Sequence, residues 1–561
     1  MKIYLVLIIL VGLSLQSCGI NTGRERVEHE ESVKQDNMAI KPLALSEQLA
    51  AKKQSTKMNQ MKAKMAMSSI YNISSMEAVH RRTYAESDNR ENYREYETGS
   101  VKSVTEVPVS TFSIDVDTGS YSNMRRFLNQ GRLPDKHAIR VEEMINYFNY
   151  SYQQPESRLT PFSLNTEIAP TPWNKNSYLL HIGLQGYEIS QQNLPPANLV
   201  FLIDVSGSMR NQNKLGLLKS GLKLLVNQLS KHDHVSLVVY AGASGVVLQP
   251  TAADQKSKIL TALDRLNAGG STNGAAGIKL AYLMAQQGFI KNGINRIILA
   301  TDGDFNVGTI NFEALKQMVE QKRKTGISLT TLGFGAGNYN DHLMEQLADA
   351  GNGNYAYIDN MNEARKVLVE QIGATLNTIA KDVKIQIEFN PALVSEYRLI
   401  GYENRTLKRE DFNNDKVDAG EIGAGHSVTA LYEITLNESK IKRLSPLGYG
   451  QFLSEKSNVI NSKSELAYLS LRYKQPGKDK SQLIQKVLYT GNIIKEKNKM
   501  SHNFIFSSAV AAFGQKLRDG KYLEDFNYGD ILSLARESKG DDDSGYRGEF
   551  IQLVALAKAL N

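Results

Sequence analysis

The sequence predicts an α/β fold for residues 197–373: a doubly wound, mostly parallel sheet with helices on both faces. The first observation is a set of near-continuous apolar runs, such as LVFLI (199–203), VSLVVY (235–240) and RIILA (296–300). Strands that are buried on both faces have this composition. The second observation is that amphipathic stretches such as KLGLLKSGLKLLVNQL separate the runs. This alternation is typical of a parallel sheet whose connections are helices.

The regions on both sides of this domain are predicted to be β-rich. Residues 107–196 read as an α+β segment, with one strand, two short helices and further strands. Residues 374–490 contain several strands with one buried face, so the two flanks could form one composite sheet or sandwich around an inserted α/β domain. The last segment, 491–561, is predicted to be helical. Helical spacing there is shared by Phe550, Leu553, Val554 and Ala557.

The start of the chain predicts an export signal that ends in a lipidated cysteine. The apolar run from Ile3 to Leu15 follows Lys2, and it is shorter than the roughly 20 residues that span a bilayer. Cys18 is the only cysteine of the chain, and LQSC resembles a bacterial lipobox. We expect residues 1–18 to be a lipoprotein signal peptide. Cys18 would then anchor an exported protein in a membrane of the bacterial cell envelope, with the outer membrane favoured over the inner.

The composition indicates a tether and excludes one class of partner. Residues 19–106 are predicted to be a disordered tether, because so polar a segment buries too little apolar surface to offset its ordering entropy. The 66 basic and 59 acidic residues leave a net charge of +7. This excess is dispersed and lacks basic clusters interleaved with aromatic residues, so we expect no nucleic-acid partner.

Oxygen-bearing side chains follow the ends of the predicted strands. FLIDVSGSM supplies Asp204, Ser206 and Ser208 directly after a buried strand, and the loops GGSTNG and ATDGD add Thr272 and Asp302. Ligands of open α/β sheets bind at the carboxyl ends of strands, so these loops should meet at one site. All the donors are hard oxygens, and the loops lack the His and Cys that Zn²⁺ favours. They predict a site for Mg²⁺, or for Mn²⁺ or Ca²⁺.

The donor set indicates how such an ion could bind a partner. Two carboxylates and weakly binding hydroxyls leave the ion with an incomplete set of strong protein ligands. A coordination position left to water can then be filled by a carboxylate of another molecule, which makes the ion a bridge between proteins. The alternative is purely local: Ser206 and Ser208 cap the next helix, and Asp204 forms an Asx turn.

The order and spacing of Asp204, Ser206, Ser208, Thr272 and Asp302 resemble the metal-ion-dependent adhesion site of the von Willebrand factor type A family, whose domain is Rossmann-like. The resemblance implies that the serines and the threonine contact the ion directly or through water, and that the aspartates act largely through water. The stretch STFSIDVDTGSYSN before the domain and the helical tail after it resemble a bacterial subfamily. In that subfamily an N-terminal von Willebrand-associated segment precedes the domain, and a C-terminal domain of unknown function follows it.

Two further stretches contain acidic motifs. IDVDT (114–118) matches the nucleophile motif of haloacid-dehalogenase-type phosphotransferases, but the strand–helix repeat that this chemistry needs is absent around it. A second cation site and a structural turn whose carboxylates cap the following helix remain as interpretations. DFNNDKVDAGE (411–421) resembles a calcium loop, yet Lys416 occupies the place of the turn glycine. A loop of a β domain fits it better.

Together these features predict a non-enzymatic, membrane-anchored binding or scaffold protein. Its metal-dependent adhesion site would engage an acidic group on a protein partner. No histidine is placed to activate the serines, which argues against nucleophilic catalysis. Two alternatives stay open: an adaptor for an envelope assembly complex with a structural metal, and a hydrolase that uses the ion as a Lewis acid.

Overall fold

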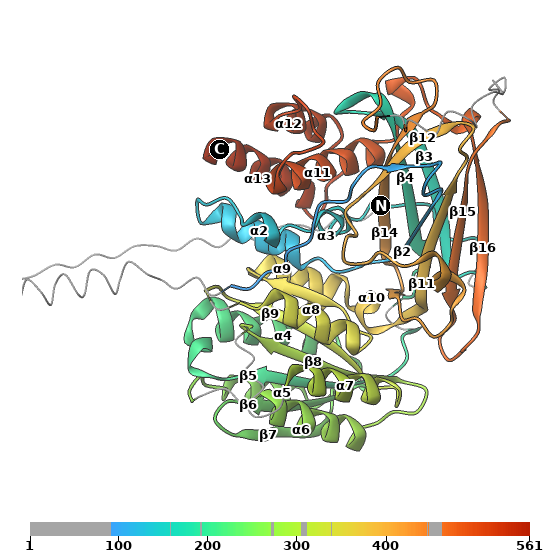
Figure 1. Cartoon of the computed structure of the whole chain (residues 1–561). Helices are drawn as coiled ribbons and strands as arrows, with labels where there is room; N and C mark the ends of the chain where they lie inside the picture. Colours follow the sequence, from blue (N-terminus) through green and yellow to red (C-terminus); the bar gives the residue numbers. More distant parts are fainter. Residues whose placement is uncertain are drawn as a thin grey trace, which may run out of the picture. The chain divides into compact units, whose positions relative to one another are not determined.

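The computed structural model of the protein describes residues 91–157, 159–190, 193–270, 274–303, 311–337, 339–445, 447 and 463–561 (Figure 1). The predicted signal peptide, the lipidation site Cys18, the ligand Thr272 and most of the predicted tether lie outside these residues. Every helix in the described part of the chain is too short or too polar to cross a membrane.

A six-stranded sheet forms the centre of the α/β region and confirms the predicted fold class. In spatial order its strands are β10 (Tyr355–Ile358), β9 (Ser328–Phe334), β8 (Ile294–Thr301), β5 (Ala197–Asp204), β6 (His234–Tyr240) and β7 (Ser244–Ala252). Neighbours pair in parallel except β6 and β7, which are antiparallel. β5 is central and buried along its whole length, as its apolar run predicts.

Helices cover both faces of this sheet because alternate residues of β5 point to opposite sides. Phe201 and Ile203 lie in the core that includes Leu222 of α4, whereas Val200 and Leu202 lie in the core that includes α6. The helices of the region are α4 (Leu217–Gln228), α5 (Lys256–Asp264), α6 (Gly274–Gln287), α7 (Phe312–Arg323), α8 (Asp341–Ala350), α9 (Met361–Arg365) and α10 (Ile372–Leu376).

Strands from before and after the α/β region pair in two further sheets, beside the α/β region in Figure 1. The first has the order β1 (Lys102–Ser103), β12 (Val394–Ile400), β14 (Ser427–Leu436), β4 (Asn174–Gly186) and β3 (Phe162–Thr171). The second has β13 (Gly420–Gly423), β11 (Thr378–Phe389), β15 (Glu465–Lys474) and β16 (Ser481–Tyr489), and β2 (Val109–Ser113) pairs with β11. One apolar core contains residues of both sheets, including Ile182 of β4 and Ile385 of β11.

The helical C-terminal region is also confirmed. It consists of α11 (His502–Arg518), α12 (Tyr528–Glu537) and α13 (Tyr546–Leu560), which share a core with α2 (Gly119–Asn129) and α3 (Val141–Asn146). Figure 1 shows this helical group adjoining the β region. The residues predicted from helical spacing are all buried in this core: Phe550, Leu553, Val554 and Ala557.

The folded region begins earlier than the sequence indicates. The tether is predicted to reach residue 106, whereas residues 91–106 lie against the rest of the fold. Glu91 pairs with Arg126 at 2.9 Å, β1 pairs with β12, and Val104 is fully buried. The composition of this segment does not predict that it is folded, because ion pairs and strand pairing hold it in place and it buries little apolar surface.

The shared sheets predict that residues 374–490 do not fold alone. In a fragment with these bounds β14 loses β4 and β11 loses β2, so we expect a gradual change of circular dichroism in urea rather than a cooperative transition. Residues 197–373 contain every strand of their own sheet and serve as the matched control, which should unfold cooperatively. A cooperative transition of the 374–490 fragment would contradict the prediction.

Candidate functional site

The candidate site lies at the carboxyl end of β5, where Asp204 is the last residue of the strand. β5 has β8 on one side and β6 on the other. After β5 the chain first adds β6 and β7 on one side, and then adds β8, β9 and β10 on the other. The loops after β5 and β8 therefore diverge at a topological switch point, which is where α/β sheets bind ligands.

Hydrogen bonds hold the fully buried Asp204 carboxylate in place. Its Oδ1 accepts from the backbone N–H of Ser206 at 2.8 Å, and its Oδ2 accepts from the hydroxyls of Thr301 at 2.9 Å and Tyr240 at 3.3 Å. Burial raises the pKa of Asp204 to about 6, and the charge of Asp302 adds to this effect. The two predicted carboxylates thus act on one another across the site.

The two serine hydroxyls lie next to each other, 3.0 Å apart, and Ser206 is buried whereas Ser208 is half-buried. The bond from the Ser206 N–H to Asp204 is the Asx-type contact considered as a local alternative. However, Ser206 makes no side-chain cap to the short helical turn Gly207–Arg210 that follows it. The capping interpretation is therefore wrong for Ser206, whose hydroxyl faces Ser208 instead.

The described ends of the Thr272 loop are tied to this serine loop. Gly207 N–H donates to the carbonyl of Gly270 at 3.1 Å, and Gly269 N–H donates to the carbonyl of Val205 at 2.7 Å. These bonds flank Ser206 on both sides in sequence. The loop that carries Thr272 thus starts beside the serines.

Sequence reasoning missed Lys214, which the structure places at the site. Its Nζ donates to Oδ2 of Asp302 at 2.8 Å, and both side chains are buried. Lys214 lies in the π-helical turn Gln212–Gly216. Gly335 has a φ of +77° and packs against the lysine stem so closely that a Cβ there would overlap it. No periodic signal marks a single lysine between a loop and a helix, so only the packing identifies it.

The donor set fits a hard divalent ion. The structure brings the loops that carry Asp204, Ser206, Ser208 and Asp302 to one end of the sheet. Among the interactions described, Asp204 bonds to Ser206, the two serines bond to each other, and Asp302 bonds to Lys214. Across the described residues there is no group of three or more His, Cys, Asp or Glu placed to hold a metal. A metal site here therefore depends on hydroxyl ligands as well as carboxylates.

The acidic motif IDVDT serves a different purpose. Asp115 and Asp117 each pair with Arg405 at 3.1 Å, and Arg405 also pairs with Asp349 of α8 at 2.8 Å. Asp117 accepts from the backbone N–H of Tyr355 at 2.8 Å. The prediction that these carboxylates cap the next helix is wrong, because α2 has no side-chain cap. They bind the N-terminal segment to the α/β region instead.

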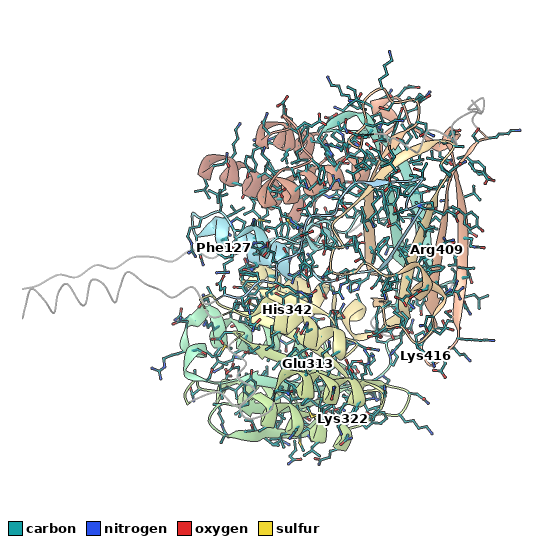
Figure 2. All side chains as sticks on the ribbon, in the orientation of Figure 1. Phe127, Glu313, Lys322, His342, Arg409 and Lys416 are labelled. Atoms are coloured by element: carbon teal, nitrogen blue, oxygen red, sulfur yellow. The ribbon has the colours of Figure 1, made fainter. Side chains whose placement is uncertain are left out.

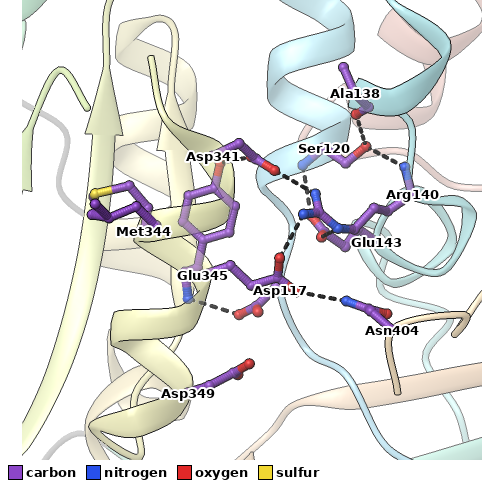
Figure 3. Close-up of polar contacts among 12 residues, drawn as sticks. Asp117, Ser120, Ala138, Arg140, Glu143, Asp341, Met344, Glu345, Asp349 and Asn404 are labelled. Atoms are coloured by element: carbon purple, nitrogen blue, oxygen red, sulfur yellow. Dashed lines mark hydrogen bonds and ion pairs between the residues drawn. The ribbon is translucent and has the colours of Figure 1, made fainter. Parts of the chain in front are cut away.

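A buried network of carboxylates surrounds this contact (Figure 3). Arg140 pairs with Asp341 and Glu345 of α8, each at 2.6 Å, and Glu345 also accepts from Asn404 at 2.6 Å. Buried carboxyl groups outnumber the two guanidinium groups here, since Glu142 and Glu143 lie in the same region. Burial raises the pKa of Glu142 to about 7.

The calcium-like stretch 411–421 forms a loop of the β region. Lys416, labelled in Figure 2, is exposed. The carbonyls of Asp411 and Asn414 accept from the buried Lys384, and that of Asp415 accepts from Lys474. Among the side-chain oxygens that a calcium loop would use, that of Asn413 accepts from Arg472 at 2.8 Å and one of Asp415 accepts from the backbone N–H of Ser481 at 3.4 Å.

Comparisons with known proteins agree with this architecture. The model described as von Willebrand factor type A domain matches residues 198–371, and the one described as von Willebrand factor matches 87–181. A third, described as the C-terminal part of uncharacterized protein YfbK, matches 374–560. Together the three models span almost all of the described chain.

Two relatives and one solved structure are similar to the chain. It is 48% identical over 474 residues to uncharacterized protein YfbK of Escherichia coli (strain K12), covering 83% of this chain and 81% of that protein. It is 25% identical over 296 residues to inter-alpha-trypsin inhibitor heavy chain H3 of Homo sapiens, covering 49% of this chain and 32% of that protein. A von Willebrand factor type A structure from Catenulispora acidiphila has a TM-score of 0.39 and 16% identity, covering 70% and 89% of the two chains.

The raised pKa of Glu142 predicts a pH-dependent stability. The buried carboxyl holds its proton up to about pH 7, whereas the unfolded chain releases it near 4.5. The free energy of unfolding therefore falls as pH rises through this window and stays lowered above it. Glu142→Gln should gain stability over the wild type between pH 4.5 and 8, by up to about 3 kcal/mol.

Urea unfolding at several pH values measures this difference. Glu410→Gln, at an exposed glutamate, is the matched control and should track the wild type at every pH. A difference between Glu142→Gln and wild type that is constant with pH would show that Glu142 is not the titrating group.

Proposed function

The chain belongs to the von Willebrand factor type A family that includes YfbK, and we propose that it is a non-enzymatic binding protein that engages an acidic group on a protein partner through a divalent ion. The observation that carries this proposal is the convergence of Asp204, the serine pair and the Asp302–Lys214 pair at one end of the sheet. Domains of this class serve protein interaction and adhesion, which sets the general role. The metal, the partner and the membrane anchor are the proposed specifics.

The residues divide the work of holding the ion. The hydroxyls of Ser206, Ser208 and Thr272 would bind Mg²⁺, or Mn²⁺ or Ca²⁺, and the carboxylates of Asp204 and Asp302 would hold its water ligands. A bound ion supplies positive charge at an edge of the sheet. The chain itself supplies fixed oxygens, because Asp204 is anchored by Thr301 and Tyr240 before any ligand arrives.

Lys214 makes this site more attractive to an acid. Two carboxylates alone would cancel the charge of a divalent ion, whereas the Lys214 ammonium neutralises part of the Asp302 charge. The loaded site then keeps a net positive charge, and a carboxylate of a partner compensates it at short range. This electrostatic reason favours an acidic partner over a basic one.

The same loops offer little for catalysis. In the part of the chain that the structure describes, the hydroxyls of Ser206 and Ser208 hydrogen-bond to each other, and no histidine contacts either. A serine nucleophile needs an adjacent base. Binding therefore accounts for the serine pair better than hydrolysis does.

We further propose that a lipid on Cys18 holds the protein in the cell envelope, with the outer membrane as the preferred site. An acylated cysteine with several chains binds a membrane surface stably without a spanning helix. The folded region from residue 91 onward would then reach its partner from that surface.

Affinity capture from solubilised envelopes tests the proposed function. The full chain is used with Mg²⁺, with EDTA, and as the Ser206→Ala, Ser208→Ala double variant. The matched control is Ser220→Ala, whose hydroxyl donates to the carbonyl of Gly216, the residue before α4. We expect a partner that is retained by the wild type and the control in Mg²⁺ alone. Retention of the same proteins in all samples would contradict a metal bridge and favour a structural metal.

The role of Lys214 predicts the direction of a change in metal affinity. Lys214→Met removes positive charge beside Asp302, so the dissociation constant for Mg²⁺ measured by calorimetry should fall at least about tenfold. Lys219→Met is the control, because that half-buried lysine donates only to backbone carbonyls. Equal or weaker affinity in Lys214→Met would show that Lys214 does not oppose the ion.

A further inference from the structure

A cavity of about 400 Å³ lies where five parts of the chain meet, away from the candidate metal site. Its walls come from residues 116–149 and 188–189 of the N-terminal segment, 366–374 at the end of the α/β region, 424–427 at the start of β14, and 544–546 at the start of α13. We call it the junction cavity. Its volume lies within the range of small-molecule sites, roughly 300–1,000 Å³.

Lys366 is the one lysine or arginine among the residues that line the junction cavity. Its side chain is buried, with 3% of the residue exposed, and its Nζ donates to the carbonyl of Tyr147 at 2.7 Å. None of the ion pairs of the described residues involves Lys366. The Nζ also lies over the aromatic rings of Tyr147 and Tyr546, at 2.8 and 5.0 Å from the ring centroids. An ammonium can donate three hydrogen bonds, and no carboxylate of the described residues lies within ion-pair distance of this one.

His426 lines the same cavity and has a buried Nδ1 with no hydrogen-bond partner. Burial and, to a smaller extent, the charge of Lys366 lower the pKa of His426 to about 4. The imidazole is therefore neutral at physiological pH, and one of its nitrogens can donate. A buried polar atom without a partner is rare in folded proteins and calls for an explanation.

The carboxylates of the cavity wall are already engaged elsewhere. Glu370 pairs with Arg365 at 3.0 Å and accepts from the Tyr546 hydroxyl at 2.8 Å, while Glu188 accepts from Gln154 at 3.1 Å. The cavity thus presents free donors rather than free acceptors. Burial lowers the pKa of Lys366 to about 7, although the nearby carboxylate of Glu363 opposes this shift. A bound anion would oppose it further.

The local backbone also distinguishes this position. Lys366 begins the π-helical turn Lys366–Glu370, which continues α9. Such turns are rare and often mark functional sites. A purely structural role would be for Lys366 to cap the carbonyl of Tyr147 at the end of α3, but that role accounts for neither the cavity nor the unpartnered nitrogen of His426.

We propose that the junction cavity binds a small organic carboxylate, with the carboxylate group against Lys366 Nζ and His426 Nδ1. This ligand is separate from the metal-bridged partner, and the proposal does not depend on the adhesion site. Because the walls come from five parts of the chain, the ligand would stabilise their association as well as fill the cavity.

Thermal unfolding of the full chain with succinate tests the proposal. Sodium chloride at equal ionic strength is the reference, and inorganic phosphate is the second probe. A ligand that binds the folded state alone raises the unfolding temperature. We expect succinate to raise it for the wild type, and Lys366→Met to lower the affinity for succinate at least about tenfold.

Lys384→Met is the matched control, because Lys384 is equally buried and also donates to backbone carbonyls, yet it does not line the cavity. This variant should respond to succinate as the wild type does. No response of the wild type, or an unchanged response of Lys366→Met, would overturn the proposal. A response to phosphate but not to succinate would overturn the carboxylate assignment.

A second measurement on the wild type avoids any dependence on the folding of Lys366→Met. The ring nitrogen resonances of His426, assigned by comparison with His426→Phe, should shift in NMR spectra as succinate is added. Unchanged resonances at succinate concentrations that raise the unfolding temperature would place the ligand elsewhere and overturn the assignment to this cavity.

Discussion

Arginines with buried or half-buried side chains bind carboxylates from distant parts of the chain and hold the α/β region to its flanks. Arg125, Arg140 and Arg405 lie outside the six-stranded sheet, in the flanking segments. Their partners within the α/β region are Asp359, Glu363, Asp341, Glu345 and Asp349. Removing one member of such a pair leaves an uncompensated charge in the interior, which costs about 3–5 kcal/mol. The sheets shared by the two flanks and this network together fix how the flanks lie against helices α8 and α9 of the α/β region.

The chain uses two buried lysines in opposite ways. Lys214 lies against a carboxylate at the end of the sheet, where it would temper the negative charge of the proposed cation site. Lys366 lies at a cavity without an ion-pair partner among the described residues, where its charge would attract the proposed anion. Both occupy π-helical turns. The two proposals thus give the same type of side chain ligands of opposite sign, because of the two only Lys214 forms an ion pair.

Local patterns were sufficient to predict most elements of the fold. The apolar run that ends at Asp204 predicts β5, because a strand buried on both faces has few polar positions. Helical spacing likewise predicts α13. Local patterns do not predict that the segment 91–106 is folded, because Glu91 and β1 are ordered by partners far away in the chain. The motif around Asp115 and Asp117 suggests functional carboxylates or helix caps. Their actual partner, Arg405, lies far along the chain, so no local pattern predicts the ion pairs.

The sequence by itself determined the α/β class, the order of the candidate ligands and the helical tail, because each depends on periodicity or short motifs. Only the tertiary structure decided the pairing of Lys214 with Asp302, the network around Arg405 and the junction cavity. These features join residues that are distant in sequence, and their energies depend on burial and on the distance between charges. The sequence pattern contains neither the burial nor the distance between charges. It therefore identifies the side chains, whereas their partners become known only from the tertiary structure.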